Sequence, residues 1–68
     1  MKLIFSDQAW EDYQYWISTN DKVRDRINEL IKQCKRTPFK GTGKPEPLKG
    51  DLTGWWSRRI SQEDRMVY

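Results

Sequence analysis

Residues 21–38, DKVRDRINELIKQCKRTP, carry the clearest structural pattern in this sequence. Apolar side chains recur there at Val23, Ile27, Leu30, Ile31 and Cys34. An α-helix has about 3.6 residues per turn, so this spacing places all of them on one helix face. The pattern predicts a helix that begins after the polar segment 19–21 and runs to about Arg36, before Pro38 ends it. Its apolar face is predicted to be core, with Cys34 as a small buried hydrophobe rather than a reactive thiol.

A second helix is predicted upstream, over residues 7–18. It is indicated by Trp10, Tyr13, Trp16 and Ile17, which recur at helical spacing and are also expected to be core. Ser6 and Asp7 are suited to cap its first turn, because a side-chain oxygen can accept from a free backbone N–H. The preceding run Lys2–Phe5 is short, apolar and partly β-branched, and predicts a first strand.

The remaining elements follow from turn-forming residues and alternation. Residues 37–47, TPFKGTGKPEP, hold all three prolines and are expected to form an exposed loop without regular structure. Residues 55–61 and 65–68 then predict a hairpin that turns at residues 62–64. The order is β-α-α-β-β. We therefore expect an α+β fold in which two helices pack on one face of a small antiparallel sheet, in a single domain over residues 1–68.

Composition excludes several classes of protein. The chain has 68 residues, one Cys and no His, so an internal disulfide, a zinc site of Cys and His, and a His-activated nucleophile are all impossible within it. We expect no metal and no cofactor. The lack of a disulfide framework, a membrane span and a signal peptide predicts a cytoplasmic protein.

Charge is unevenly distributed along the chain. Residues 1–21 carry one basic and four acidic side chains, net −3, whereas residues 22–68 carry twelve and six, net +6, which sums to +3. A basic region with interspersed aromatic residues is typical of a protein that binds a polyanion such as RNA. A solvated basic surface is an equal alternative at this point.

The loop GKPEPLK, residues 43–49, is the first candidate site. Glu46 stands between two prolines and is flanked by Lys44 and Lys49. Prolines reduce the conformations that a carboxylate must lose on binding, and nearby cations attract a phosphodiester. Glu46 could then remove a proton from a ribose 2′-OH. On chemistry alone, an ordinary exposed acid is the more frequent interpretation.

Three arginines of the predicted hairpin form the second candidate. If Arg58, Arg59 and Arg65 share a sheet face, their planar donors could hold a phosphate. The alternative is ordinary pairing with Asp51, Glu63 or Asp64.

Four segments resemble the YoeB toxins of the RelE/ParE toxin–antitoxin superfamily. They are MKLIFSDQAWEDYQYW, INELIK, RTPFKGTGKPEPLK and WWSRRISQEDRMVY, in the family's order from Met1 to Tyr68. The resemblance implies a RelE-like fold and a ribosome-dependent messenger-RNA endonuclease that inhibits translation and is neutralised by a YefM-type antitoxin. It implies Glu46 as the general base and Arg65 as the phosphate contact in the transition state. Lys44, Lys49, Arg58 and Arg59 fall at basic positions expected to contact messenger or ribosomal RNA.

The sequence departs from the family pattern at its C-terminal end. The family continues into another strand and ends in His-Tyr, with the His as general acid, whereas this sequence has no His. We expect a base and a phosphate contact without that acid, and a C-terminally incomplete sheet that needs a partner, either the antitoxin or a second copy. A non-catalytic module that binds the antitoxin or the ribosome stays an alternative, and the gyrase-poisoning branch of the superfamily is a weaker one.

Overall fold

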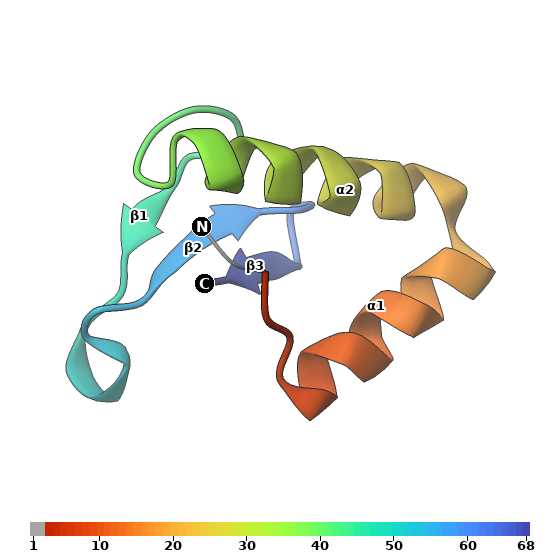
Figure 1. Ribbon diagram of the computed structural model, residues 1–68, viewed down its shortest axis with the longest axis horizontal. Coiled ribbons are helices and arrows are strands. Elements are labelled where there is room, and N and C mark those ends of the chain that lie inside the picture. The colour runs from red at the N-terminus through yellow and green to blue at the C-terminus, as the bar shows by residue number, and fades with distance from the viewer. Residues whose placement is uncertain (1–2) are drawn as a thin grey trace.

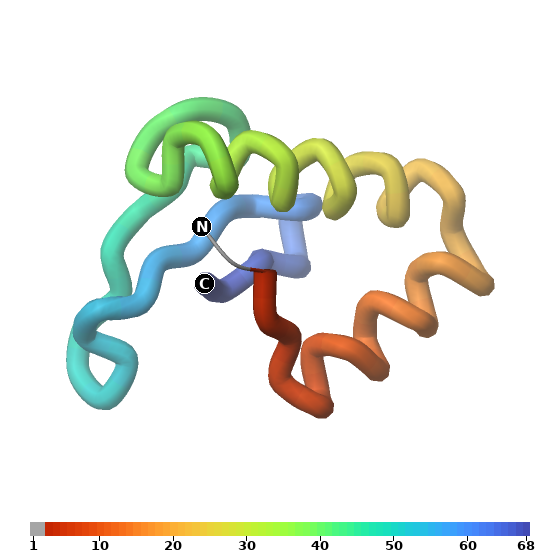
Figure 2. The backbone as a smooth tube through the Cα atoms, viewed as in Figure 1, coloured from red at the N-terminus to blue at the C-terminus, as the bar shows by residue number. Residues whose placement is uncertain are grey.

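The computed structural model describes residues 3–68, which form two helices and a three-stranded antiparallel sheet (Figures 1 and 2). The strand order is β1-β2-β3, so β2 is central. The elements are α1 (Asp7–Thr19), α2 (Asp21–Arg36), β1 (Glu46–Pro47), the short 3-10 helix η1 (Gly50–Leu52), β2 (Trp56–Arg59) and β3 (Arg65–Val67). The predicted α+β class, with its two helices and its hairpin, is confirmed.

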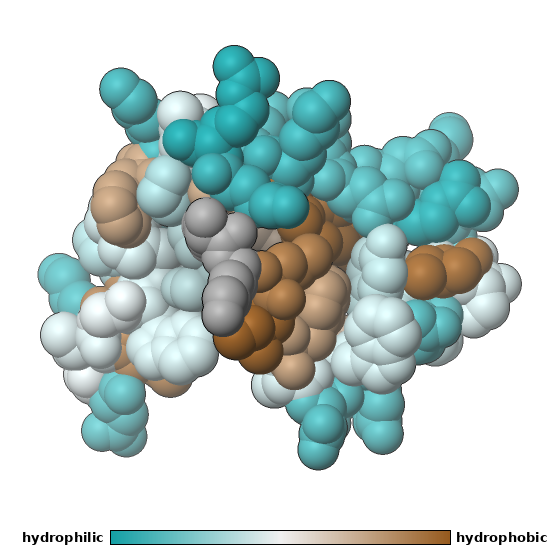
Figure 3. Space-filling model, viewed as in Figure 1, coloured by the Kyte–Doolittle hydropathy of each residue, from teal (hydrophilic) through white to brown (hydrophobic). Residues whose placement is uncertain are grey.

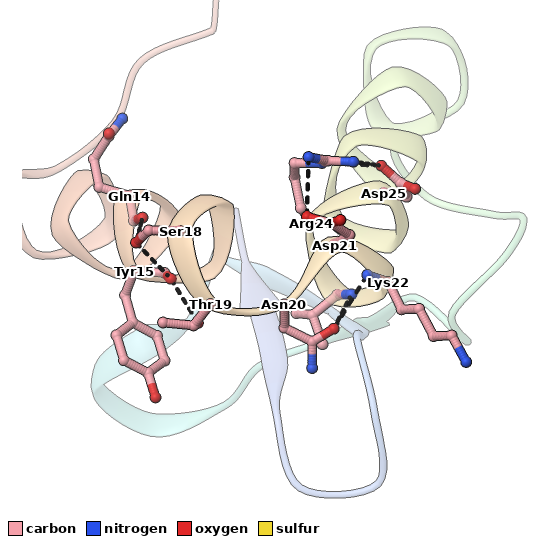
Figure 4. Close-up of polar contacts among 10 residues, drawn as sticks. Gln14, Tyr15, Ser18, Thr19, Asn20, Asp21, Lys22, Arg24 and Asp25 are labelled. Carbon is pink, nitrogen blue, oxygen red and sulfur yellow. Dashed lines mark hydrogen bonds and ion pairs between the residues drawn. The ribbon is translucent and has the colours of Figure 1, made fainter.

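Side-chain caps set the start of both helices. Ser6 Oγ accepts from the Ala9 backbone N–H at 3.1 Å and caps α1, as the sequence predicted. Asn20 lies between the helices, where its Oδ1 accepts from the backbone N–H groups of Lys22 and Val23 at 3.1 Å each (Figure 4). Its own N–H donates to the Trp16 carbonyl, so one residue ends α1 and begins α2.

The apolar core is small and comes mainly from α2. Ile27, Leu30 and Cys34 are the buried hydrophobic residues among those described, which confirms the stripe predicted for this helix. In contrast, α1 buries none of its residues, and Trp10 and Ile17 are exposed. The expectation that the α1 stripe is core was therefore wrong for residues 3–68. Figure 1 shows the reason, because α1 diverges from α2 while α2 lies along the sheet.

Tyr13 and Trp16 of the α1 stripe instead line an open groove of about 920 Å³. Its other walls come from the segment 3–6, from the apolar face of α2 and from β3. Figure 3 shows apolar side chains gathered in the middle of this face, in the space between the two helices.

Two further sequence predictions need correction. Leu3–Phe5 form no strand, and Lys2 of the predicted strand lies outside the described residues. A strand needs a hydrogen-bonding neighbour, and the Phe5 ring packs instead against Trp10, at 5.5 Å between ring centroids. Conversely, the loop 37–47 ends in a strand, since Glu46–Pro47 pair with β2. A proline is tolerated there because β1 is an edge strand.

Arg58 fixes the loop between α2 and β1. Its side chain is fully buried, and its Nη atoms donate to the backbone carbonyls of Thr37, Lys40 (2.9 Å) and Thr42 (3.2 Å). Its Nε donates to Tyr68 Oη at 3.1 Å, and Nη1 lies 3.4 Å from Gln33 Oε1. No carboxylate within residues 3–68 pairs with Arg58, and its burial is tolerated because its donors are satisfied in this way.

Gly43 allows the same loop to approach the core. Its φ is +88°, and a Cβ there would lie 3.0 Å from Leu30 Cδ2 and 3.2 Å from both Arg58 Cβ and the Arg59 carbonyl oxygen. The Gly43 carbonyl also accepts from the Arg59 backbone N–H at 2.7 Å, which continues the sheet past β1.

Neither helix within residues 3–68 combines the length and the apolar character that a membrane crossing requires.

The close approach at Gly43 leads to a stability prediction. Gly43→Ala should lower the free energy of unfolding more than Gly50→Ala. Both positions have a positive φ, but a Cβ at Gly50 meets nothing within 4 Å. The backbone strain common to both is about 1–2 kcal/mol, and overpacking adds about 1–3 kcal/mol at Gly43 alone. Urea unfolding measures both, and equal losses would contradict the proposed crowding.

A second prediction concerns alkaline pH. Burial raises the pKa of the Cys34 thiol above its usual 9.0 and that of the Tyr68 phenol above its usual 10.0, although Arg58 acts in the opposite direction on both. The folded chain therefore keeps protons that the unfolded chain releases, so stability is unaffected at neutral pH and falls as the pH rises past about 9. Urea unfolding from about pH 7 to about pH 10.5 should show this decline.

Cys34→Ala tests the contribution of the thiol to that decline. The variant loses packing at every pH, but its loss of stability near pH 9 should be shallower than that of the parent chain. An unchanged slope would show that the thiol does not contribute.

Candidate functional site

One face of the sheet brings together four polar side chains from its three strands. Glu46 in β1 is the register partner of Ser57 in β2, and Arg65 in β3 is the partner of Arg59. Because alternate residues of a strand point to the same side, Glu46, Ser57, Arg59 and Arg65 share one face. Arg58 and Met66 point to the opposite face, toward α2.

Arg65 joins these three strands. Its Nη2 lies 2.7 Å from Glu46 Oε1, and its Nε donates to Ser57 Oγ at 3.0 Å. Ser57 is buried, whereas the Arg65 and Glu46 side chains are 34% and 59% exposed. The ion pair is thus open to solvent above a buried hydroxyl.

The sequence had placed Glu46 and Arg65 in one site, and the structure brings them into contact. The alternative pairing of the hairpin arginines with Asp51, Glu63 or Asp64 does not occur within residues 3–68, where Arg65 pairs with Glu46. The pair is a weak constraint, since an exposed ion pair contributes only about 0–1 kcal/mol. A phosphate could therefore replace the carboxylate on Arg65 at little cost.

Glu46 is held in place by the pairing of β1 with β2. Pro45 and Pro47 flank it, and β1 pairs with β2 through Glu46 and Pro47. The Leu48 N–H continues this pairing to the Trp55 carbonyl at 2.8 Å. The carboxylate is therefore carried by a short paired strand and not by a free loop.

Three of the four predicted RNA contacts are exposed around this face. Lys44 and Lys49 lie on either side of β1, and Arg59 ends β2. The bond between the Arg59 N–H and the Gly43 carbonyl places Arg59 beside the Lys44 end of the loop. Arg59, as the register partner of Arg65, adds positive charge next to the Glu46–Arg65 pair.

Arg58 does not belong to this group. The family resemblance implied that Arg58 contacts RNA beside Arg59, but its guanidinium is fully buried on the other sheet face. Strand alternation separates the two neighbours, so Arg59 faces solvent while Arg58 binds the loop 37–42. Arg58 has a structural role in this fold.

Ser57 was missed by the sequence analysis. The strand segment Trp56–Arg59 contained the signal, because alternation puts residue 57 on the same face as residue 59. Its pairing with Glu46 was not visible, since β1 was expected to be loop.

Chemically, this face offers a carboxylate as a proton acceptor and, in direct contact with it, a guanidinium that donates hydrogen bonds to anions. Within residues 3–68, no three His, Cys, Asp or Glu side chains gather as a metal-binding group.

Comparisons with known proteins point in the same direction. Residues 5–68 match the family described as the YoeB-like toxins of bacterial type II toxin–antitoxin systems. The whole chain is 59% identical to the toxin YoeB of Escherichia coli K12 and 56% identical to that of Streptomyces coelicolor, and covers 81% of each.

Solved structures give the same result. The chain superimposes with a TM-score of 0.97 on a YoeB/ParE toxin from Agrobacterium tumefaciens, at 54% identity, and covers 79% of it. A YoeB dimer from Staphylococcus aureus gives 0.93 at 48% identity, again with 79% of that chain covered. The chain therefore belongs to the YoeB-like toxins of bacterial type II toxin–antitoxin systems.

Proposed function

We propose that this toxin is a ribosome-dependent messenger-RNA endonuclease whose reaction takes place at the Glu46–Arg65 pair. The observation that supports it best is the 2.7 Å contact between these side chains on an open, cation-flanked sheet face. A phosphodiester bound by Arg65 would bring its neighbouring ribose close to the Glu46 carboxylate. General-base catalysis requires such proximity.

In the proposed reaction, Glu46 accepts the proton of the ribose 2′-OH. The resulting oxygen attacks the adjacent phosphorus, and the bond to the 5′-oxygen breaks. The products are a 2′,3′-cyclic phosphate and a 5′-hydroxyl. Arg65 stabilises the negative charge that develops on the phosphate oxygens.

The leaving 5′-oxygen takes up a proton from solvent water, because no His is present in the 68 residues. The open apolar groove beside α1 favours a second candidate function, a non-catalytic module that binds the antitoxin or the ribosome. The two candidates differ in one observable. Primer extension on messages translated in the presence of this chain gives stops at ribosomal A-site codons only if the chain cleaves RNA.

The central prediction separates catalysis from binding. Glu46→Gln removes the base and Arg65→Ala removes the phosphate contact, so each should lower cleavage of ribosome-bound message by about 100-fold or more. Binding to the ribosome should stay within about twofold. Glu63→Gln, an exposed acid in the hairpin turn, is the matched control and should cleave normally.

Substitutions of the flanking cations should have the opposite effect in the same assays, with a larger loss of ribosome binding than of cleavage. Lys49→Gln and Arg59→Gln should weaken ribosome binding and its salt dependence, with a smaller effect on the cleavage step. If Glu46→Gln and Arg65→Ala lost binding and cleavage equally, both residues would be docking groups and the proposed reaction would be wrong.

We further propose a YefM-type antitoxin as the partner of this toxin. YoeB and YefM from Staphylococcus aureus have been solved together as a heterotetramer, and this chain matches that YoeB at 48% identity. The same species also provides a YoeB dimer, which makes a second copy the other candidate. The open apolar groove beside α1 supports the need for a partner, since monomeric proteins rarely expose large apolar patches.

This partner proposal predicts how the isolated chain behaves. Sedimentation should show self-association, and a YefM-type antitoxin should convert the chain to a defined complex with a higher melting temperature. A stable monomer that melts cooperatively on its own, with no shift on adding antitoxin, would contradict it.

A further inference from the structure

Ser57 is buried directly beneath the Glu46–Arg65 pair, and the proposed reaction gives it no role so far. It is one of two buried polar or charged residues within the described chain, the other being Arg58. Its hydroxyl accepts from Arg65 Nε at 3.0 Å, and its Cα is the register partner of Glu46. The serine thus touches the arginine and lies opposite the carboxylate.

The contacts of Arg65 use one edge of its guanidinium. Nε donates to Ser57 and Nη2 to Glu46, and these two nitrogens lie on the same edge of the planar group. Within residues 3–68, Nη1 has no hydrogen-bond partner, so the edge formed by Nη1 and the second N–H of Nη2 stays free. A guanidinium edge of this kind matches two oxygens of a phosphate.

The hydrogen bond from Arg65 to Ser57 involves a buried residue, whereas the ion pair from Arg65 to Glu46 is open to solvent. Glu46 is more than half exposed, and its carboxylate must turn toward a ribose to act as a base. When the Glu46 carboxylate turns away from Arg65, the hydrogen bond from Arg65 Nε to Ser57 Oγ still fixes the plane of the guanidinium. Ser57 cannot move far, because it lies in the central strand and is paired on both sides.

We propose that Ser57 is a positioning residue that orients Arg65, so that its free edge faces the scissile phosphate next to Glu46. This inference rests on the proposed endonuclease reaction and adds to it a residue that touches neither the RNA nor the reacting atoms. The role requires a buried hydrogen-bond acceptor at position 57, which serine supplies.

Two measurements on Ser57→Ala test the role. In NMR spectra, the Arg65 Nε–H should exchange with solvent at least about tenfold faster than in the parent chain, because its acceptor is gone. Cleavage of ribosome-bound message at saturating toxin should fall about tenfold, with the half-saturating concentration unchanged within about twofold. Ser57→Thr keeps a hydroxyl and should restore both.

Ser61→Ala is the matched control. It removes another serine hydroxyl, one that accepts from the Glu63 and Asp64 backbone N–H groups in the hairpin turn, and should change neither measurement. Thermal melting of each variant sets an assay temperature at which all of them are folded. A general loss of folding would then appear in the melting curves and not be read as loss of positioning.

The outcomes separate this inference from the reaction on which it rests. Unchanged Nε–H exchange in Ser57→Ala, unchanged cleavage, or a failure of Ser57→Thr to restore exchange would overturn the role of Ser57. Full cleavage by Glu46→Gln and Arg65→Ala would overturn the proposed reaction instead. Loss of cleavage in those two variants together with normal cleavage by Ser57→Ala would leave the reaction standing and refute the positioning role.

Discussion

The buried guanidinium of Arg58 is the interaction on which the arrangement of this small protein depends. It lies on the α2 side of the central strand and donates hydrogen bonds to three backbone carbonyls of the loop 37–42. Within the described residues, Phe39 of this loop packs on Trp56 at 4.7 Å between ring centroids, and the hydrogen bonds of Arg58 fix the loop backbone. Because leaving a buried cation unsatisfied is very unfavourable, the loop can adopt few other conformations while β2 stays paired.

Arg58 also affects the position of the candidate site, because the loop that it binds leads directly into β1. The loop that it holds leads through Gly43 into Lys44, Pro45 and Glu46, so the position of the carboxylate depends on contacts made on the opposite sheet face. Gly43 fixes the chain between this loop and β1. Its carbonyl accepts a hydrogen bond from the Arg59 N–H, and its lack of a Cβ leaves room for Leu30. Arg58 and Arg59 are neighbours in β2 but have different roles, because Arg58 binds the loop and Arg59 faces solvent.

Local sequence patterns predicted most of this fold. Both helices, the Ser6 cap, the hairpin and the burial of Cys34 follow from spacing and capping chemistry within single segments. The first strand and the α1 core stripe were wrong because each depends on tertiary partners, and within residues 3–68 Leu3–Phe5 pair with no strand and α1 buries none of its residues. The strand at Glu46–Pro47 was missed for a related reason. The prolines predicted a loop, and the pairing of this segment depends on β2, which is a separate segment of the chain.

The candidate site was predictable as a set of residue types but not as a geometry. Resemblance to the family pointed to Glu46 and Arg65, and their contact required a three-stranded register that no single segment encodes. The same register explains why Arg58 was assigned wrongly and Ser57 was overlooked. A one-residue difference along β2 exchanges the face that carries Glu46 and Arg65 for the face toward α2, so the adjacent Ser57 and Arg58 are both buried but make their hydrogen bonds on opposite sides of the sheet. In a sheet this small, the strand register decides which polar side chains can meet a substrate.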